Sequence, residues 1–358
     1  MMLRPPSRFA KPMTSRLPIA LLAAVMAAPL VAQDDTIYLI TGTATTGVKV
    51  TSWDVRYLKF TKGNSPDQVS TDQVARLELG KFKDVYARGL RDPDLMLTRA
   101  KEVLADKDLV MAQLGFVGAA AQFFDAEKPQ EAVGTLDELV KAIPEAGVLP
   151  EVYRQKFEYY MGVGPKGAQS AIAVAKKYAN DALGGAWPTG LGIEAEFFTT
   201  LAERTDPKDF QNKLRTVAGK AGGNYPIIAN RANVELAHSL RETKDVDGAQ
   251  RIYEEVMKKE GADSSSRAGA YLGFGKIVMD KASAADKDAF KKAMLLFLRV
   301  RLETKDAWPS LHAEALYHAM LAANKWQGPE FGLVIGRCRR LLNDEFSGSE
   351  WNDKAKRL

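Results

Sequence analysis

The chain has 358 residues, 46% of them hydrophobic, so it can bury a large core and is not a disordered protein. It has 50 basic and 45 acidic residues, but four basic residues and no acidic one precede Ala32, which leaves 46 against 45 from residue 33 onward. This near balance removes the support for a nucleic-acid or membrane-surface protein, because such proteins need a basic stripe and none stands out. The single cysteine, Cys338, excludes an intrachain disulfide.

Residues 1–32 are typical of a signal peptide. Basic residues without any acidic one are followed by the apolar run IALLAAVMAAPLVA, which ends in small residues. Cleavage is expected after Ala32, so the exported chain begins at Gln33 and belongs to the periplasm or the cell envelope. Two alternatives stay open, an uncleaved N-terminal membrane anchor and a mitochondrial transit peptide. The run is shorter than the roughly 20 residues that span a bilayer, so no stable membrane insertion is expected once the leader is removed.

Residues 33–80 are predicted to form a small β-domain. Apolar and polar residues largely alternate, and turn signals at Thr41-Gly42 and at KGNSP, residues 62–66, separate the runs. The pattern indicates four or five short strands in a meander that could curl into a small barrel. A domain of about 50 residues is marginal alone, so it is expected to pack on the segment that follows.

After Gly80, helix signals follow one another almost without interruption. Proline and glycine breaks separate them, and their short connections require neighbouring helices to be antiparallel. No convincing strand is found after residues 76–79. The start and stop signals predict helices over 93–106, 109–124, 129–143, 150–161, 166–180, 188–204, 207–221, 226–243, 247–260, 265–281, 286–303, 309–325 and 329–343.

Six of the predicted hairpins repeat at a regular interval. They begin near residues 109, 150, 188, 226, 265 and 309, a spacing of about 38 to 44 residues that is typical of a solenoid. The clearest unit is NVELAHSLRETKDVDGAQRIYEEVMKKEG, which starts at Asn233. Its small and large apolar residues stand at offsets that recur in FVGAAAQFFDAEKPQEAVGTLDELVKAIPE, and more loosely between 272 and 300. In the first unit these residues are Leu236, Ala237, Leu240, Ala249, Tyr253 and Val256.

This pattern resembles the tetratricopeptide repeat, in which small residues let two helices approach and large ones fill the gap between hairpins. The resemblance covers most of 109–343 by architecture but only two or three repeats by motif, because 150–180 and 188–221 match the small and large positions poorly. It implies a mainly α fold with an α-solenoid over 109–346. A connecting helix in 81–108 would precede the solenoid, and a polar cap at 347–358 would close it.

In tetratricopeptide repeats the first helix of each hairpin lines the concave face of the array. The resemblance therefore implies a non-enzymatic binding or scaffolding protein of the bacterial cell envelope, which recognises a peptide or protein segment on that face. A purely structural role in an envelope complex shares this fold. The alternative from another class is a carbohydrate-active enzyme or glycan-binding protein with an α/α toroid, which would need two acidic residues facing one another across a cavity. The candidate partner-binding residues are Arg231, His238, Arg241, Arg267 and Phe274.

Other motifs are better explained by a structural role than by a catalytic, cofactor-binding or metal-binding one. GVGPKG, residues 162–167, fits a dinucleotide fingerprint in letters, but it follows a helix and not a strand, so a turn is predicted. Glu314 and His318 share a helix face but lack further metal ligands nearby, and His312 lacks the cysteines of a zinc deaminase. Cys338 is predicted to be buried on an apolar helix face, although the arginines beside it would make an exposed thiol reactive.

Paired carboxylates and tryptophans also have simple explanations. Glu254 and Glu255 could do acid–base work but are expected on a solvated helix face, and tryptophans at helix ends are expected to fill gaps more often than to stack on sugars. Accordingly, no catalytic residue, metal site or cofactor is predicted. The oligomeric state stays open.

Overall fold

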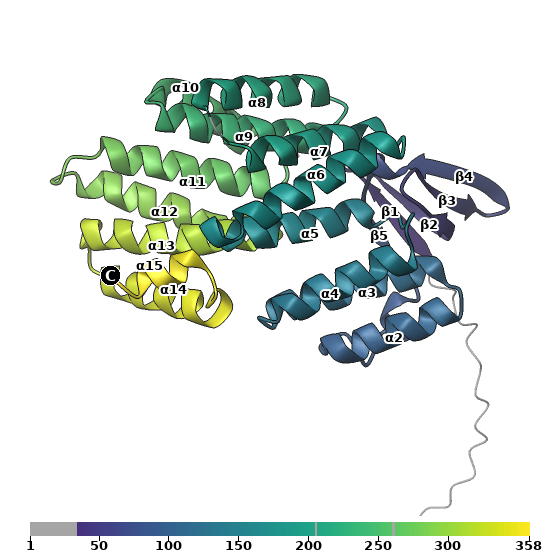
Figure 1. Ribbon diagram of the computed structural model, residues 1–358. Coiled ribbons are helices and arrows are strands. Elements are labelled where there is room, and N and C mark those ends of the chain that lie inside the picture. Colours follow the sequence, from purple (N-terminus) through teal and green to yellow (C-terminus); the bar gives the residue numbers. More distant parts are fainter. Residues whose placement is uncertain (1–33, 205, 260–261) are drawn as a thin grey trace, which may run out of the picture. The chain divides into compact units, whose positions relative to one another are not determined.

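The computed structural model describes residues 34–204, 206–259 and 262–358. A five-stranded antiparallel sheet comes first, and helices then follow one another to the C-terminus (Figure 1). The predicted mainly α fold with a small N-terminal β-domain is therefore confirmed. The predicted leader, residues 1–32, lies outside the described residues. Within the described part, no helix is both long enough and apolar enough to cross a membrane.

The sheet has the strand order β4-β3-β2-β1-β5. Its first four strands form the predicted meander, and β5 returns to pair with β1 instead of β4. Gly63, at φ +60°, supplies the left-handed backbone that the two-residue turn between β3 and β4 requires. The strands are β1 (Asp35–Leu39), β2 (Ala44–Trp53), β3 (Tyr57–Lys62), β4 (Ser65–Ser70) and β5 (Val74–Glu78), with a short 3₁₀ helix η1 (Thr71–Gln73) before β5.

Each of the thirteen helices with predicted limits is found, and its ends lie within four residues of those limits, while α1 and α15 are additional short helices. Asp245, for example, caps its helix by accepting the Gly248 N–H at 2.9 Å, and several other helices begin with a proline, which needs no N–H partner there. The helices are α1 (Phe82–Val85), α2 (Pro93–Ala105), α3 (Leu109–Asp125), α4 (Pro129–Ala142), α5 (Leu149–Gly162), α6 (Ala168–Gly184), α7 (Thr189–Ala202), α8 (Pro207–Ala221), α9 (Pro226–Glu242), α10 (Val246–Lys258), α11 (Ser264–Lys281), α12 (Lys287–Glu303), α13 (Pro309–Trp326), α14 (Phe331–Glu345) and α15 (Glu350–Ala355).

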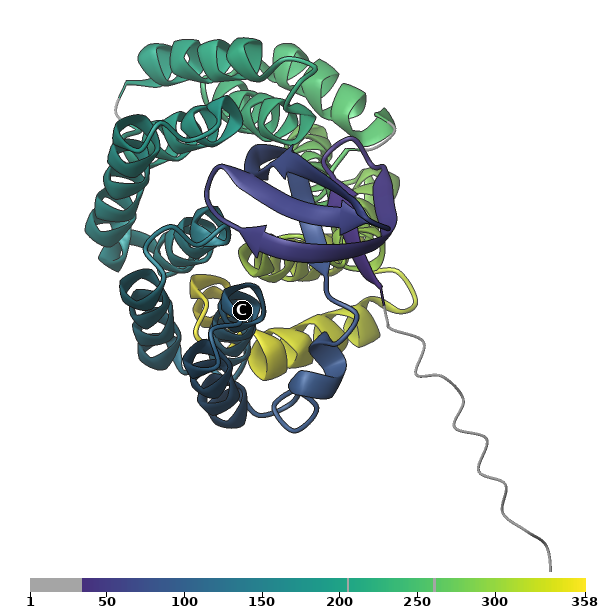
Figure 2. The same cartoon turned by 90° about the vertical axis from the view of Figure 1, so that its right-hand side faces the viewer.

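The helices from α3 to α14 stack as six successive hairpins. First helices of neighbouring hairpins pack on one another, as in α3 with α5, α7 with α9, α9 with α11 and α11 with α13, whereas the second helices make no comparable contact among the described residues. Because the first helices lie closer together than the second ones, the stack bends with the first helices on its inner face. Figure 2 shows the helices following this curve. We call α5, α7, α9, α11 and α13 the inner helices.

Large residues fill the gaps between hairpins, as the repeat pattern predicts. The ring of Tyr253 on α10 is fully buried against Gly273 on α11, where an added Cβ would lie 2.1 Å from the tyrosine Cζ. Within the next hairpin, Gly275 of α11 lies in the same way against the ring of Phe297 on α12. The helices can therefore approach closely only because these positions carry no side chain.

The sheet is fixed to the helices by buried polar contacts. One face of the sheet packs its apolar residues on Val110 of α3. The amide of Gln113, also on α3 and fully buried, donates to the Trp53 carbonyl and accepts the Val148 N–H, each at 3.2 Å. At the other end, η1 meets the start of α7 and of α9. The sheet is thereby held against the inner helices.

Candidate ligand-binding cavity

A cavity of about 360 Å³ lies where the inner helices meet η1 and β5. Five acidic and two basic residues line it, so its walls carry an excess of negative charge. Apart from Thr71 and Ser265, its remaining walls carry no polar side chain other than the hydroxyl of Tyr225 and the indole of Trp308, and the segment before α13 closes one side. The lining residues are Ile40, Thr71, Asp72, Val74, Ala75, Glu151, Arg154, Glu158, Gly190, Leu191, Glu194, Tyr225, Ile227, Ile228, Arg231, Ser265, Asp306, Ala307, Trp308 and Pro309.

The η1 wall of the cavity is held in place by Asp72. One of its carboxylate oxygens accepts the Gly190 N–H at 3.0 Å and the Tyr225 hydroxyl at 2.9 Å. These partners belong to the start of α7 and to the N-cap of α9. A charge-assisted contact of this kind fixes the sheet relative to two inner helices.

An ion pair between the buried Glu194 and the partly exposed Arg154 forms the floor of the cavity. Arg154 on α5 binds Glu194 on α7 through two parallel hydrogen bonds, Nε to Oε1 and Nη2 to Oε2, each 2.8 Å long. The hydroxyl of Tyr178 donates to the same Oε2 at 2.7 Å. Burial alone would raise the pKa of Glu194, but the Arg154 guanidinium and these hydrogen bonds hold it below its usual value. Glu194 is therefore an ionised carboxylate with both oxygens engaged.

Glu158, one turn after Arg154 on α5, is in a different state. Its Oε1 atom is shielded from solvent and has no hydrogen-bond partner among the described residues. Burial raises the pKa of Glu158 to about 8, although the charge of Arg231 opposes the shift, while Glu151 adds to it. In this cavity Glu194 is thus ionised, whereas Glu158 is mostly protonated at neutral pH.

Arg231, on α9, completes the cavity on its far side. Its Nε lies 3.4 Å from Oδ1 of Asp263, and its guanidinium carbon lies 4.9 Å from the centre of the Trp308 ring. Both the arginine and the aspartate are largely buried. The cation is therefore already paired with an anion and an aromatic face.

A second group of charged residues continues along α9, α11 and α13. Lys276 forms an ion pair with Glu314, whose Oε1 also lies 3.7 Å from His318 Nε2. Burial raises the pKa of Glu235 to about 7, and it lowers that of His238 to about 3. A neutral His238 can accept the Tyr253 hydroxyl at Nδ1, 2.5 Å away. Charged and polar side chains therefore run along the inner face beyond the cavity.

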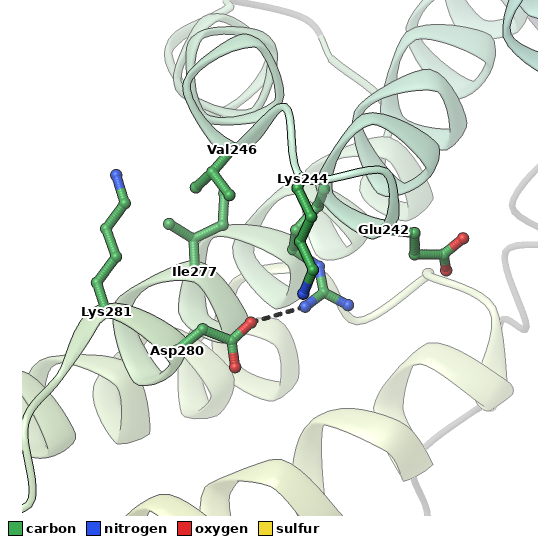
Figure 3. Close-up of a pocket in the computed structure, with 7 residues that line it drawn as sticks. Glu242, Lys244, Val246, Ile277, Asp280 and Lys281 are labelled. Carbon is green, nitrogen blue, oxygen red and sulfur yellow. Dashed lines mark hydrogen bonds and ion pairs between the residues drawn. The ribbon is translucent and has the colours of Figure 1, made fainter. Parts of the chain in front are cut away.

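A second cavity, of about 630 Å³, lies at the ends of α9 and α11 (Figure 3). Arg241 Nη1 binds Asp280 Oδ2 there at 2.9 Å. Most of the other lining residues, including Lys244 and Lys281, are exposed. A wall of mostly exposed charged side chains offers little desolvated contact, so the cavity beside η1 is the stronger candidate site.

The five residues predicted to contact a partner are not brought into one site. Arg231 lines the cavity beside η1, Arg241 lines the second cavity, and His238 lies between them on α9. Arg267 bonds weakly to two carbonyls of the preceding loop, at 3.4 and 3.5 Å. The ring of Phe274 packs against two core clusters and has Lys292 Nζ 5.6 Å from its centre. These last two side chains have evident structural roles.

The remaining motifs take ordinary places in the fold. GVGPKG forms the end of α5, the short 3₁₀ helix η2 (Gly164–Lys166) and the turn into α6, so the predicted turn is correct. Cys338 is buried, and burial raises the pKa of its thiol to about 11 against the opposite effect of Arg337. In the described ranges no group of three or more His, Cys, Asp or Glu side chains could hold a metal ion.

Most of the cavity is not singled out by the sequence, including Arg154, Glu158 and Glu194, whereas Trp308 is one of the tryptophans expected to fill a gap. A signal was present, since these glutamates and Arg154 fall in the two hairpins that match the repeat pattern poorly. Charged residues stood there at helix positions that an array would fill with apolar ones. No model of a known protein family matches the chain, and no curated protein matches it either. The fold and the cavity thus define a helical-repeat protein with a charged inner face.

The state of Glu158 predicts a pH dependence of stability. Its pKa is about 8 when folded and near 4.5 when unfolded, so the folded chain binds more protons between these values, and stability is lost as the pH rises. Relative to the wild type, Glu158→Gln is expected to gain about 2 kcal/mol in free energy of unfolding between pH 6 and pH 8. Denaturant unfolding at both pH values measures this. Glu255 is exposed on α10, so Glu255→Gln should show no such gain. The pKa assigned to Glu158 would be contradicted if the free energies of unfolding of the two variants changed with pH in the same way.

Proposed function

We propose that this chain is a non-enzymatic binding protein of the bacterial cell envelope, which holds a peptide or protein segment on its inner helical face. The observation that carries the proposal is the row of charged residues along the inner helices, ending in the cavity beside η1. Desolvated charges cost stability even when they are paired, and hydrophobic replacements of similar volume often fold as well. Such a row is best explained by a ligand that uses it.

Two further features support this proposal. The hairpins resemble tetratricopeptide repeats, a family that recognises extended segments with the first helix of each hairpin. The inner face carries side chains of both charge signs from α5 to α13, which suits a polypeptide. The signal-like leader supports an envelope location, where the exported chain would begin at Gln33.

Selection of a random-peptide library on the immobilised chain from Gln33 onward tests the proposal. Peptides that are enriched should bind the chain in solution, and their affinity is measured by fluorescence anisotropy. On the inner face, Glu235→Gln and Trp308→Phe are expected to weaken binding about tenfold, as loss of one well-buried interface contact does. On the outer face, Glu255→Gln should leave the affinity within about twofold.

The comparison of these variants distinguishes specific binding on the inner face from non-specific adhesion of peptides. Circular dichroism and the melting temperature of each variant show whether it is folded. If no peptide is enriched, or if Glu255→Gln weakens binding as much as the inner variants do, the proposed function is wrong.

One observation favours the second candidate, a glycan-active enzyme. Glu158 and Glu194 share a cavity in which their environments push their pKa values apart, as in an acid–base pair. Both oxygens of Glu194, however, are engaged by Arg154 and Tyr178, which leaves no free carboxylate oxygen for a nucleophile or a base. Incubation with a glycan panel tests this candidate. Turnover that Glu158→Gln abolishes would replace the binding proposal.

A further inference from the structure

We propose that the cavity beside η1 receives a cationic group, the ammonium of a lysine or the guanidinium of an arginine, with Glu158 as its counter-ion. This inference rests on the proposed function, because it names the part of a bound segment that would enter the cavity. It goes further in assigning a ligand chemistry to one site.

The charges in the cavity support a cation. Arg154 is committed to Glu194 and to Glu151, whose Oε2 lies 3.3 Å from Arg154 Nη1. Arg231 is committed to Asp263, which lies outside the lining. The two cations that line the cavity are thus already paired. No hydrogen bond or ion pair among the described residues engages the Glu158 carboxylate, and its Oε2 atom, unlike Oε1, is not shielded from the cavity. A ligand that brings a donor to Oε2 gives this half-buried carboxylate the partner that it lacks.

The size and the walls of the cavity fit the same ligand. A volume of about 360 Å³ holds one long side chain but not a folded element. The aliphatic stem of a lysine or arginine can lie along Ile227, Leu191 and the ring of Tyr225. The ring of Trp308 already receives one guanidinium, that of Arg231, so it is a face suited to cations.

Binding should be coupled to loss of a proton. The charged groups that line the cavity with Glu158 are Glu151 and Arg154 on its own helix, Asp72 on η1, Glu194 on α7, Arg231 on α9 and Asp306 before α13. With a pKa of about 8, Glu158 is mostly protonated at pH 7. A bound ammonium favours the carboxylate, so the carboxylic acid releases its proton to solvent as the ion pair forms.

Titration calorimetry with blocked single residues tests the inference. The probes are Nα-acetyl-lysine methylamide, its arginine equivalent, and the neutral norleucine equivalent as the matched control. At pH 7, in two buffers of different ionisation enthalpy, the cationic probes are expected to release close to one proton each. Their affinity should rise about tenfold per pH unit below pH 8 and level off above it. In Glu158→Gln both effects should disappear, whereas Glu255→Gln should keep them.

The outcomes separate this inference from the proposed function. Equal binding of norleucine and lysine probes, or an unchanged pH profile in Glu158→Gln, would overturn the cationic site even if library peptides bind the inner face. If library peptides fail to bind while the lysine probe binds with proton release, the site stands and the peptide function falls. 1,5-Diaminopentane serves as a further probe. If it binds more tightly than the blocked lysine, the cation comes from a free amine and not from a polypeptide, which overturns the assignment to a bound segment.

Discussion

Replacement of Glu194 by alanine is expected to lower the free energy of unfolding by about 3–5 kcal/mol, because it leaves a partly buried guanidinium without its anion. Glu194 is 5% exposed and accepts three hydrogen bonds from Arg154 and Tyr178. Its removal strands both donors and opens the floor of the cavity. Denaturant unfolding followed by circular dichroism measures the loss.

The control for this prediction lies two residues along the same helix. Glu196 forms an ion pair with Lys220 on the solvated side of α7. Glu196→Ala should cost less than about 1 kcal/mol, since exposed ion pairs contribute little. The pair of changes Arg154→Met and Glu194→Leu should recover most of the stability lost in Glu194→Ala. Similar losses for Glu194→Ala and Glu196→Ala would show that the pair is not buried in solution.

Tyr253→Ala is expected to cost about 3–5 kcal/mol, as deletion of a buried aromatic ring usually does. The ring fills the gap between two hairpins and lies against Gly273. Because Gly273 has no side chain, the space left by the ring can be closed only by a shift of the whole α11 helix. The substitution also removes the hydroxyl that bonds to His238.

A phenylalanine at the same position separates packing from hydrogen bonding. Tyr253→Phe keeps the ring and should cost only about 1 kcal/mol. The thermal melt of each variant gives the comparison. If the phenylalanine variant were as unstable as the alanine variant, the hydrogen bond to His238 and not the filled gap would hold the two hairpins together.

Most of the helical fold could be predicted because its signals are local. A proline or an aspartate marks many helix starts, such as Pro309 and Asp245, and short connections force antiparallel neighbours. The small and large pattern around Tyr253 also arises within about 30 residues of sequence. The partner of β5 could not be predicted, because β5 pairs with the first strand of the sheet, and alternation within a strand does not show which strand lies beside it.

The cavity could not be predicted because its residues meet only in three dimensions. Arg154 and Glu194 belong to different hairpins, and 153 positions of sequence separate Asp72 from Tyr225. The repeat pattern predicts that every first helix lines the inner face, and it does not distinguish one first helix from another. It named Arg231, which lines the cavity, but it could not show that Asp263 and Trp308 engage the Arg231 guanidinium.

The contacts of the sheet have a consequence for how the array unfolds. Hairpins that touch only their neighbours open one at a time from the ends, because no contact couples distant units. Here Gln113 and Asp72 join the sheet to α3, α7 and the start of α9, so these hairpins share contacts that must break together. Amide hydrogens from α3 to α9 should therefore exchange in one cooperative event, while α13 and α14 open earlier and more often.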